Sequence, residues 1–243
     1  MTGGAASRLY LFQLGTASIP LGDQLMDMSF GCYLVQTADG KNVLIDTGLA
    51  ADFVPPPEMP PLSLQPNVLE QLAALGVRPD DVDVVVSTHF DPDHAGYHDA
   101  FPNAEHVVQR EHYESARGGH PRFAGPRNHW DHPALRYRLI DGDTELVPGV
   151  TLIATSGHAP GHQSVLVRLP RTGPVLLAID AVVLERLFTP DRAAGPLDDD
   201  EEQLRASTSK LLDLAAREDV ALVVFGHDGA QWQSLQTAPD WYE

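Results

Sequence analysis

Residues 82–96 read VDVVVSTHFDPDHAG, a short apolar run followed by a turn that holds four potential metal ligands. The apolar part is typical of a buried strand, because strands covered on both faces are nearly continuous runs of Val, Ile and Leu. The four ligands are His89, Asp91, Asp93 and His94. Imidazole and carboxylate groups both bind divalent cations, so this segment predicts a strand that ends at a metal site.

Three further potential ligands lie beside other predicted strands. They are His158 in TSGHAPGHQS, Asp180 in LLAID and His227 in FGHD. Taken alone, each has an ordinary explanation as a turn residue or a buried structural histidine. In layered α/β proteins, however, sites gather where the carboxyl ends of strands converge. We therefore expect all seven side chains to meet, in a set that suits two divalent cations with a bridging aspartate.

The rest of the chain alternates between strand-like and helix-like patterns. Asp39-Gly40 between two apolar runs indicates a hairpin. Asn67, with Glu70 three positions later, indicates a capped helix start. Strands are expected at 8–13, 82–86, 150–155, 163–169, 175–179 and 220–225, and an amphipathic helix at 200–217 with Leu204, Leu211, Leu212 and Ala215 on its apolar face. Such an order of elements predicts a layered α/β protein.

Two stretches lack a regular pattern. Residues 51–66 hold six prolines and are expected to form a long surface loop, because proline cannot continue a helix or a central strand. Residues 110–140 show no clear period and are expected to form a short helix and an irregular insertion. Neither stretch resembles a linker, so residues 1–243 are expected to form a single domain.

Composition and charge exclude several classes of function. The single cysteine, Cys32, excludes a disulfide framework and a cysteine-rich zinc module. The net charge of −18 argues against nucleic-acid and anionic-membrane partners. No apolar run is long enough to span a membrane, and the N-terminus lacks the pattern of a signal peptide. A cytoplasmic location is therefore expected.

The ligand pattern resembles that of the metallo-β-lactamase superfamily, whose signature is a His-x-His-x-Asp-His turn followed by a later His, an Asp and a last His. The resemblance extends from VLIDTG at 43–48 to FGHD at 225–228. The motifs TSGHAPGHQS and FGHD are most similar to the acyl-homoserine lactonase branch of that superfamily. The resemblance implies an αβ/βα four-layer sandwich with a two-metal site between its sheets.

The resemblance also implies a role for each residue. His89, Asp91 and His158 hold one metal ion, Asp93, His94 and His227 hold the second, and Asp180 lies between the two ions. Asp46 matches an aspartate that supports a ligand from behind. Gly157 and Gly161 shape the loop that carries His158, whereas His162 is structural rather than metal-bound. The ions are expected to be Zn, Mn or Fe.

Two residues depart from the family pattern. Asp91 replaces the second signature histidine, and Val183 stands where the acyl-homoserine lactonases carry a tyrosine. Asp91, Asp93, Asp180 and a bridging hydroxide together cancel the charge of two divalent cations. A histidine in place of Asp91 would leave one positive charge. A neutral site predicts a weaker Lewis acid that favours Mn²⁺ or Fe²⁺ over Zn²⁺.

The other histidines lie outside the motif spacing. We expect surface or rim positions for His98, His106, His112, His120, His129 and His132. The segment from His120 to His132, with Phe123 and Trp130, is a candidate to line a substrate pocket.

The leading hypothesis is a metal-dependent hydrolase that opens a lactone or cleaves a related small-molecule ester. A metal-activated water is the expected nucleophile, and Asp93 is the expected catalytic residue that assists departure of the alkoxide. The alternative is a di-iron oxidoreductase that reduces O₂ or NO with a separate electron donor, because flavodiiron proteins also place a carboxylate at the position of Asp91. A non-catalytic scaffold is a third reading. The oligomeric state stays open, with a homodimer as one candidate.

Overall fold

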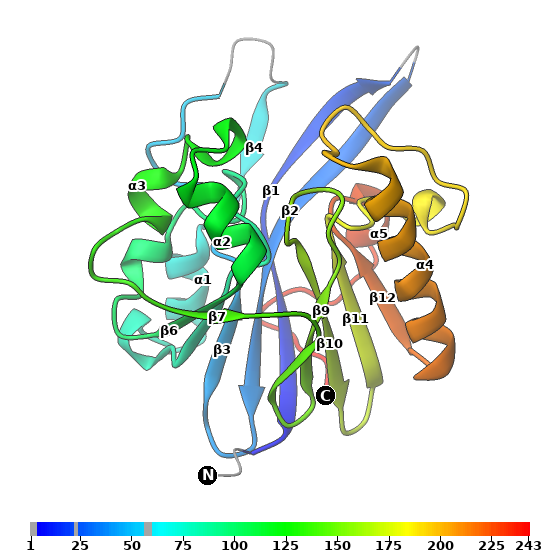
Figure 1. The fold of residues 1–243 in the computed structure, drawn as a ribbon. Helices are drawn as coiled ribbons and strands as arrows, with labels where there is room; N and C mark the ends of the chain where they lie inside the picture. Colours follow the sequence, from blue (N-terminus) through cyan, green and yellow to red (C-terminus); the bar gives the residue numbers. More distant parts are fainter. Residues whose placement is uncertain (1–3, 22–23, 56–59) are drawn as a thin grey trace.

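The computed structural model describes residues 4–21, 24–55 and 60–243. Its strands form two sheets that pack face to face, with helices on both outer sides (Figure 1). One sheet has seven strands in the order β4-β1-β2-β3-β5-β6-β7, and the other has five in the order β12-β11-β10-β9-β8. The expected αβ/βα sandwich is confirmed.

The elements follow one another along the chain in two groups. The seven-stranded sheet consists of β1 (Ala6–Leu21), β2 (Gln24–Thr37), β3 (Asn42–Ile45), β4 (Leu62–Leu64), β5 (Val84–Val86), β6 (Glu105–Gln109) and β7 (Arg136–Ile140). The five-stranded sheet consists of β8 (Thr144–Val147), β9 (Val150–Ala154), β10 (Gln163–Leu169), β11 (Gly173–Ile179) and β12 (Leu222–Phe225). The helices are α1 (Val68–Ala74), α2 (Arg110–Arg117), α3 (Arg127–Trp130), α4 (Glu201–Arg217) and α5 (Gly229–Trp232).

Strand direction decides where the ends of the strands meet. Pairing is antiparallel from β1 to β3 and from β8 to β11. It is parallel along β3, β5, β6 and β7, and again between β11 and β12. The carboxyl ends of each parallel group therefore lie at one edge of their sheet.

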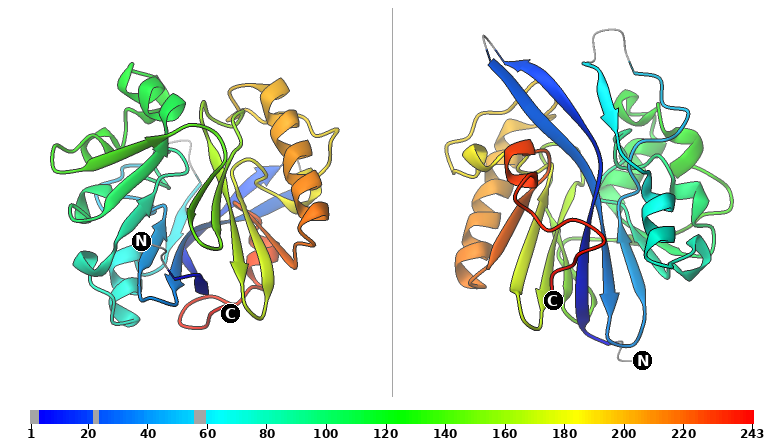
Figure 2. Two further views of the ribbon diagram at one scale, coloured as in Figure 1. Left: turned by 60° about the horizontal axis from the view of Figure 1, so that its bottom comes forward. Right: turned by 180° about the vertical axis from the view of Figure 1, so that it is seen from behind.

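Alternation along the strands separates the layers. Leu9 and Leu11 of β1 point into the core between the two sheets, whereas Tyr10 and Phe12 pack with α1 on the outer face. On the other sheet, Leu211 of α4 packs against the outer face. Figures 1 and 2 show the result, with α1 to α3 on one outer side and α4 on the other. Each sheet is thus apolar on both faces, as a central layer requires.

Two local predictions are confirmed in detail. The Asp39-Gly40 turn joins β2 to β3, and Gly40 takes the left-handed conformation with φ of 87°. Asn67 caps α1, because its side-chain oxygen accepts the N–H groups of Leu69 and Glu70 at 3.0 and 3.1 Å. The Glu70 carboxylate accepts the N–H of Asn67 in return, at 2.8 Å.

Several predictions about elements were wrong. Strands β4, β6, β7 and β8 were missed, because short strands at or near a sheet edge carry charged residues that hide their alternation. Strand β4 lies inside the stretch at 51–66 that was predicted as a loop, although only as an edge strand, and residues 56–59 of that stretch lie outside the described residues. The stretch at 110–140 holds α2, α3 and β7, and so is more regular than expected.

Two boundaries also differ from the predictions. Strand β5 begins at Val84, because Pro79–Asp81 forms a 3₁₀ turn that uses Val82 as its cap. The buried face of α4 includes Leu204, Leu211 and Leu214. Leu212 and Ala215, which were expected on that face, are only half-buried. Among the described residues, every helix is too short or too polar to cross a membrane.

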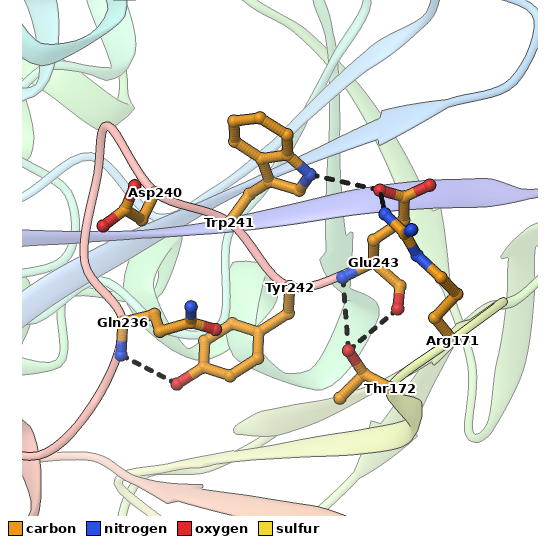
Figure 3. A pocket seen from close by; sticks show the side chains of 7 residues that line it. All are labelled: Arg171, Thr172, Gln236, Asp240, Trp241, Tyr242 and Glu243. Atoms are coloured by element: carbon orange, nitrogen blue, oxygen red, sulfur yellow. Dashed lines mark hydrogen bonds and ion pairs between the residues drawn. The ribbon is translucent and has the colours of Figure 1, made fainter.

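The C-terminal segment is fixed at the end of the sandwich opposite to the predicted ligands. Tyr242 exchanges two backbone hydrogen bonds of 2.9 Å with Leu9. Glu243 and Thr172 are joined by hydrogen bonds of 2.9 and 3.2 Å beside the small pocket of Figure 3. Thr172 precedes β11, whereas Asp180 follows it. The pocket in Figure 3 is therefore a strand length away from the ligand cluster.

Candidate metal centre

Four loops at one edge of the sandwich carry the seven predicted ligands. Strand β5 leads into the turn with His89, Asp91, Asp93 and His94, while β9, β11 and β12 lead to His158, Asp180 and His227 in that order. Strands β11 and β12 are parallel neighbours, so their carboxyl ends place two of these loops side by side. The structure brings all seven side chains together.

His89, Asp91 and His158 form a first triad. One atom of each side chain lies within 4.8 Å of the others, a spacing that could hold a metal ion. Oδ2 of Asp91 is 3.4 Å from Nε2 of His89 and 3.4 Å from Nε2 of His158. Both histidines are buried and Asp91 is half-buried. Two nitrogens and one oxygen are a donor set that suits zinc and other first-row divalent ions.

Asp93, His94 and His227 form a second triad with the same 4.8 Å limit. Oδ2 of Asp93 is 3.5 Å from Nε2 of His94 and 3.6 Å from Nε2 of His227. The two triads therefore have the same composition, with one carboxylate oxygen and two imidazole nitrogens in each.

Asp180 lies between the two triads. Its Oδ2 is 3.8 Å from Nε2 of His89 and 3.3 Å from Nε2 of His158 in the first triad. It is 3.7 Å from Nε2 of His94 and 3.1 Å from Nε2 of His227 in the second. A single carboxylate thus faces four imidazole nitrogens, which is the position of a ligand shared by two ions.

The second triad is fixed from behind by groups of the first sheet. Nδ1 of His94 lies 2.9 Å from Oδ2 of Asp46. Asp46 in turn accepts the N–H and the hydroxyl of Thr88, at 2.8 and 2.7 Å. Nδ1 of His227 donates to the carbonyl oxygen of Ser29 at 2.9 Å. These bonds leave Nε2 of both histidines free to face the centre, as partners of metal-bound histidines commonly do.

The backbone next to two of these carboxylates is strained. Asp46 has φ of 61° and Ile179, which precedes Asp180, has φ of 52°. A β-branched residue in the left-handed region is a genuine outlier. Strain of this kind persists only where the surrounding structure enforces it, and here it sets the direction of Asp46 and of Asp180.

The first triad is fixed by a different set of groups. Nδ1 of His158 lies 2.9 Å from Oδ1 of Asp198, in the loop before α4. Oδ2 of Asp198 accepts the N–H of Gly195 at 2.6 Å and lies 3.5 Å from Nη2 of Arg192. Nδ1 of His89 lies 3.0 Å from the hydroxyl of Thr88, the same hydroxyl that contacts Asp46.

The loop that carries His158 depends on its glycines, as predicted. Gly157 and Gly161 have φ of +135° and +65°. A Cβ atom at Gly157 would lie 2.3 Å from the nitrogen of Leu204, and one at Gly161 would lie 2.4 Å from the nitrogen of His112. Only glycine fits such positive φ values this close to neighbouring backbone.

Arg122 is the main functional residue that the sequence reasoning missed. It lies in a 3₁₀ turn at Pro121–Phe123 and reaches the first triad from outside the ligand loops. Its Nε and Nη2 donate to Oδ1 and Oδ2 of Asp91 at 2.6 and 2.5 Å. The only available signal was chemical: a buried carboxylate in place of a histidine calls for a nearby cation.

This arginine corrects the predicted charge of the site. The neutral total rested on three carboxylates and a hydroxide against two divalent ions, and it omitted the positive charge of Arg122. With Arg122 included, the total is one positive charge, as it would be with a histidine in place of Asp91. The predicted weakness of the Lewis acid and the predicted preference for Mn²⁺ or Fe²⁺ lose their basis.

Charges within the cluster shift the pKa values of its members. Burial would raise the pKa of Asp180, but the charges of His227 and His94 outweigh it and hold that pKa well below its usual value. Burial would lower the pKa of His227, but the charge of Asp180 outweighs it and raises that pKa to about 9. A metal ion that binds these imidazoles must therefore displace protons.

The donor set fits two divalent ions. Among the described residues, Nε2 of His89, Nε2 of His94 and Oδ1 of Asp180 are buried without a hydrogen-bond partner. Leaving a buried polar atom without a partner is costly, and these three atoms face one another across the cluster. A pair of cations would satisfy them.

The expectation that the remaining histidines are surface or rim residues was wrong for three of them. His98, His106 and His112 are fully buried, while His120 and His129 are half-buried and His132 is exposed. His98 is bonded on both sides, 2.9 Å from the hydroxyl of Thr47 and 2.8 Å from that of Ser87. Each buried ring fills a polar gap in the core that sequence spacing cannot show.

Other predicted residues of the site have structural contacts. His162 is buried 2.9 Å from the hydroxyl of Thr155, and its ring centre lies 5.0 Å from that of His89. Phe123 and Trp130 are fully buried in a cluster under α2 and α3, so they do not line an open pocket. Val183 is half-buried, and its carbonyl accepts the N–H of His227 at 2.9 Å.

Comparison with known proteins gives a consistent result. A family profile described as "Metallo-beta-lactamase superfamily" matches residues 32–227. An N-acyl homoserine lactonase of Bacillus sp is 33% identical, over 90% of this chain and 88% of that protein. The crystal structure of a quorum-quenching N-acyl homoserine lactone lactonase superposes with a TM-score of 0.87 at 30% identity, over 99% of this chain and 100% of the other. A second structure, of an N-acyl homoserine lactone hydrolase with its product N-hexanoyl-L-homoserine at the catalytic metal centre, superposes with a TM-score of 0.86 at 28% identity, over 98% and 100%.

Proposed function

The chain belongs to the metallo-beta-lactamase superfamily, and from that premise we propose that it hydrolyses the ester bond of an N-acyl homoserine lactone. It is a metal-dependent hydrolase of the lactonase type that uses two divalent ions. The relatives named above are all hydrolases, and none supports the di-iron oxidoreductase that the sequence left open. The observation that carries the proposal is the pair of triads joined by Asp180.

The assignment of the seven ligands is part of this proposal. His89, Asp91 and His158 would hold one ion, Asp93, His94 and His227 the other, and Asp180 would be shared. When bound, the two ions supply an acidified water as nucleophile and polarise the ester carbonyl. The distances between the donor atoms and the three unpartnered buried atoms support this arrangement.

Asp93 has the best position for moving a proton. Its side chain is 19% exposed, more than that of any other proposed ligand, so it is the one that substrate can approach. While Oδ2 faces His94 and His227, the second oxygen can take the proton from the attacking water. The same oxygen can then give that proton to the alkoxide that leaves when the ring opens.

An apolar cavity beside the second triad supports an acyl-chain substrate. It has a volume of about 490 Å³, and its walls include Leu14, Phe30, Leu49 and Phe53. The ring of Phe30 lies edge-on to that of His227, with 5.4 Å between their centres. A hydrocarbon chain that enters this cavity would therefore hold its polar head against the ligand cluster.

Val183 narrows the expected chemistry. A tyrosine hydroxyl could donate a hydrogen bond to a substrate carbonyl, whereas the Val183 side chain offers no donor. We infer that the reaction relies on the cluster itself for carbonyl polarisation, and that simple lactones and activated esters are turned over along with acyl-homoserine lactones.

A lactone panel tests the proposal directly. The zinc-loaded protein is given homoserine lactones with short, medium and long acyl chains, an unsubstituted γ-lactone, a linear ester and a phosphodiester, and acid release is followed by pH-stat. We expect the homoserine lactones to be fastest, with rates that rise as the acyl chain lengthens to fill the cavity. Faster phosphodiester cleavage, or no lactone opening at all, would contradict the proposal.

The wider setting of the enzyme is also proposed. We take residues 1–243 as one domain that acts on a small molecule in the cytoplasm, without a nucleic-acid or membrane partner. The net charge of −18 supports the last point, since it repels polyanions. A homodimer remains a prediction that gel filtration with light scattering would test.

A further inference from the structure

Arg122 binds Asp91 at the one position where the ligand turn departs from its family pattern. Its Nε lies 2.6 Å from Oδ1 of Asp91 and its Nη2 lies 2.5 Å from Oδ2, so the guanidinium holds both oxygens. The side chains are only 14% and 13% exposed. A bidentate, charge-assisted bond that is largely shielded from water fixes the orientation of a carboxylate.

The guanidinium is also held from its other side. Nη1 donates to the carbonyl oxygens of His158 and Leu197 at 2.7 and 2.5 Å, and lies 3.3 Å from Oδ1 of Asp199. These partners belong to the loop that carries His158 and to the loop before α4. The position of Arg122 is therefore set by the fold and not by Asp91 alone.

Charge connects this arginine with the departure from the family pattern. A neutral histidine at position 91 would add no charge to the site. Ionised Asp91 adds one negative charge, and Arg122, which keeps its proton in proteins, adds one positive charge. The pair is thus equal in charge to a neutral imidazole, although it offers an oxygen instead of a nitrogen.

We propose that Arg122 is a positioning residue of the first triad, which makes Asp91 a charge-compensated ligand in place of the histidine found in the family pattern. Nε can keep Oδ1 while Oδ2 faces the ion. The inference rests on the proposed function, because it concerns the same two-ion site. It adds that the value of Arg122 depends on which residue occupies position 91.

The contacts of Nη2 give the proposal an unusual consequence. Nη2 lies 2.5 Å from Oδ2 of Asp91 and 2.5 Å from Nε2 of His158, two donor atoms of the first triad. Removal of the arginine takes away a cation that competes for both atoms, so zinc binding should not weaken. Turnover should fall nonetheless, because uncompensated Asp91 lowers the positive charge that activates the water and the carbonyl.

Four proteins test the proposal: the wild type, Arg122→Ala, Asp91→His and the double variant. The zinc affinity of each metal-free protein is measured by competition with a chromogenic chelator, and kcat is measured on a homoserine lactone. We expect Arg122→Ala to lower kcat about tenfold or more while zinc affinity stays equal or rises, and Asp91→His to weaken zinc binding about tenfold. The double variant should recover both properties to within about threefold of the wild type, since the family pattern is then restored.

Two further variants complete the design. Arg127→Ala removes the same charge from an exposed pair with Asp131, and it should change neither quantity. Arg122→Lys keeps the charge but loses the bidentate bond, so its kcat should lie between those of the wild type and Arg122→Ala. It also replaces Arg122→Ala in the comparison if that variant does not fold.

The outcomes separate the proposal from its competitors. Loss of zinc affinity by the same factor in both backgrounds would show that Arg122 only supports the His158 loop, and would overturn the proposal. Equal kcat for Arg122→Lys and Arg122→Ala would overturn the charge compensation. The zinc measurements need no substrate, so a wild type that binds two zinc ions but opens no lactone would count against the proposed function alone.

Discussion

The two triads have the same donor atoms but are held in different ways. In the second triad, His94 and His227 are backed by Asp46 and by the carbonyl oxygen of Ser29, both of which belong to the first sheet and the loop that follows it. In the first triad, the backing groups come from loops: Asp198 contacts His158, and Arg122 contacts Asp91.

This difference teaches where the site can change. A ligand backed by sheet residues is fixed by the core, and any substitution behind it disturbs packing. A ligand backed by loop residues can be exchanged when one loop residue changes with it, as Asp91 and Arg122 illustrate. We therefore expect the second triad to be the more rigid and the first to be the one in which variation is tolerated.

The largest effect is expected from His227→Ala, which removes a ligand from the rigid triad. Zinc content should fall from two ions towards one per chain. Turnover should fall by more than about a hundredfold, because even partners behind the ligands are worth about 10–100-fold. Metal analysis and pH-stat rates measure both, with His132→Ala as the control because that histidine is exposed and lies outside the cluster. Two ions and full activity in His227→Ala would show that the residue is a bystander.

Asp91→Ala should break the first triad and leave the second intact. The variant removes one donor from the first ion and leaves Arg122 without its carboxylate partner, so zinc content should again approach one per chain. The remaining ion should bind as tightly as the tighter ion of the wild type, because Asp93, His94 and His227 are untouched. A chelator titration shows the number of steps. Loss of both ions at once would mean that the triads are not independent.

A matched pair of variants compares the backing groups directly. Asp46→Asn and Asp198→Asn each remove one negative charge from behind a histidine while the shape of the side chain is kept. Both should cost about 10–100-fold in zinc affinity, with the larger loss for Asp46 because it also binds Thr88. Equal losses would erase the distinction between sheet-backed and loop-backed ligands.

The smallest expected effect is the pH dependence of the metal-free protein. The pKa of His227 is raised to about 9 by Asp180, so its stabilising contribution is fully present below the unfolded value of about 6.5. That contribution is lost as the pH rises through 9, and it amounts to a few kcal/mol at most. Thermal unfolding of the chelator-treated protein should therefore show a Tm that falls between neutral and alkaline pH. The decline should be smaller in His227→Gln, and an equal decline in both proteins would assign it to other groups.

Sequence patterns predicted the sandwich and the ligand set because both have local signatures. The turn from His89 to His94 packs four donors beside a buried strand, and each later ligand also follows an apolar run. Strands such as β7, RYRLI, carry no such signature, because long charged side chains on an edge replace the apolar alternation.

Contacts between distant loops have no local signature at all. Arg122 lies 31 positions after Asp91, and Asp198 lies 40 positions after His158. Nothing in the spacing of either pair distinguishes it from many others. The burial of His98, His106 and His112 escaped prediction for a similar reason, since their hydroxyl and carbonyl partners are provided only by the folded core.

The bond from His227 to the carbonyl oxygen of Ser29 joins positions 198 residues apart, and this gives the site a timetable. At about 5–20 residues per second, a ribosome needs roughly 10–40 s to make the chain between them. During that interval the turn at 89–94 is exposed with only part of its donor set, and an ion that it captures is held weakly. Strong binding begins only when β12 joins its sheet, so the enzyme acquires its metals after synthesis, from whatever ions the surrounding cell then offers.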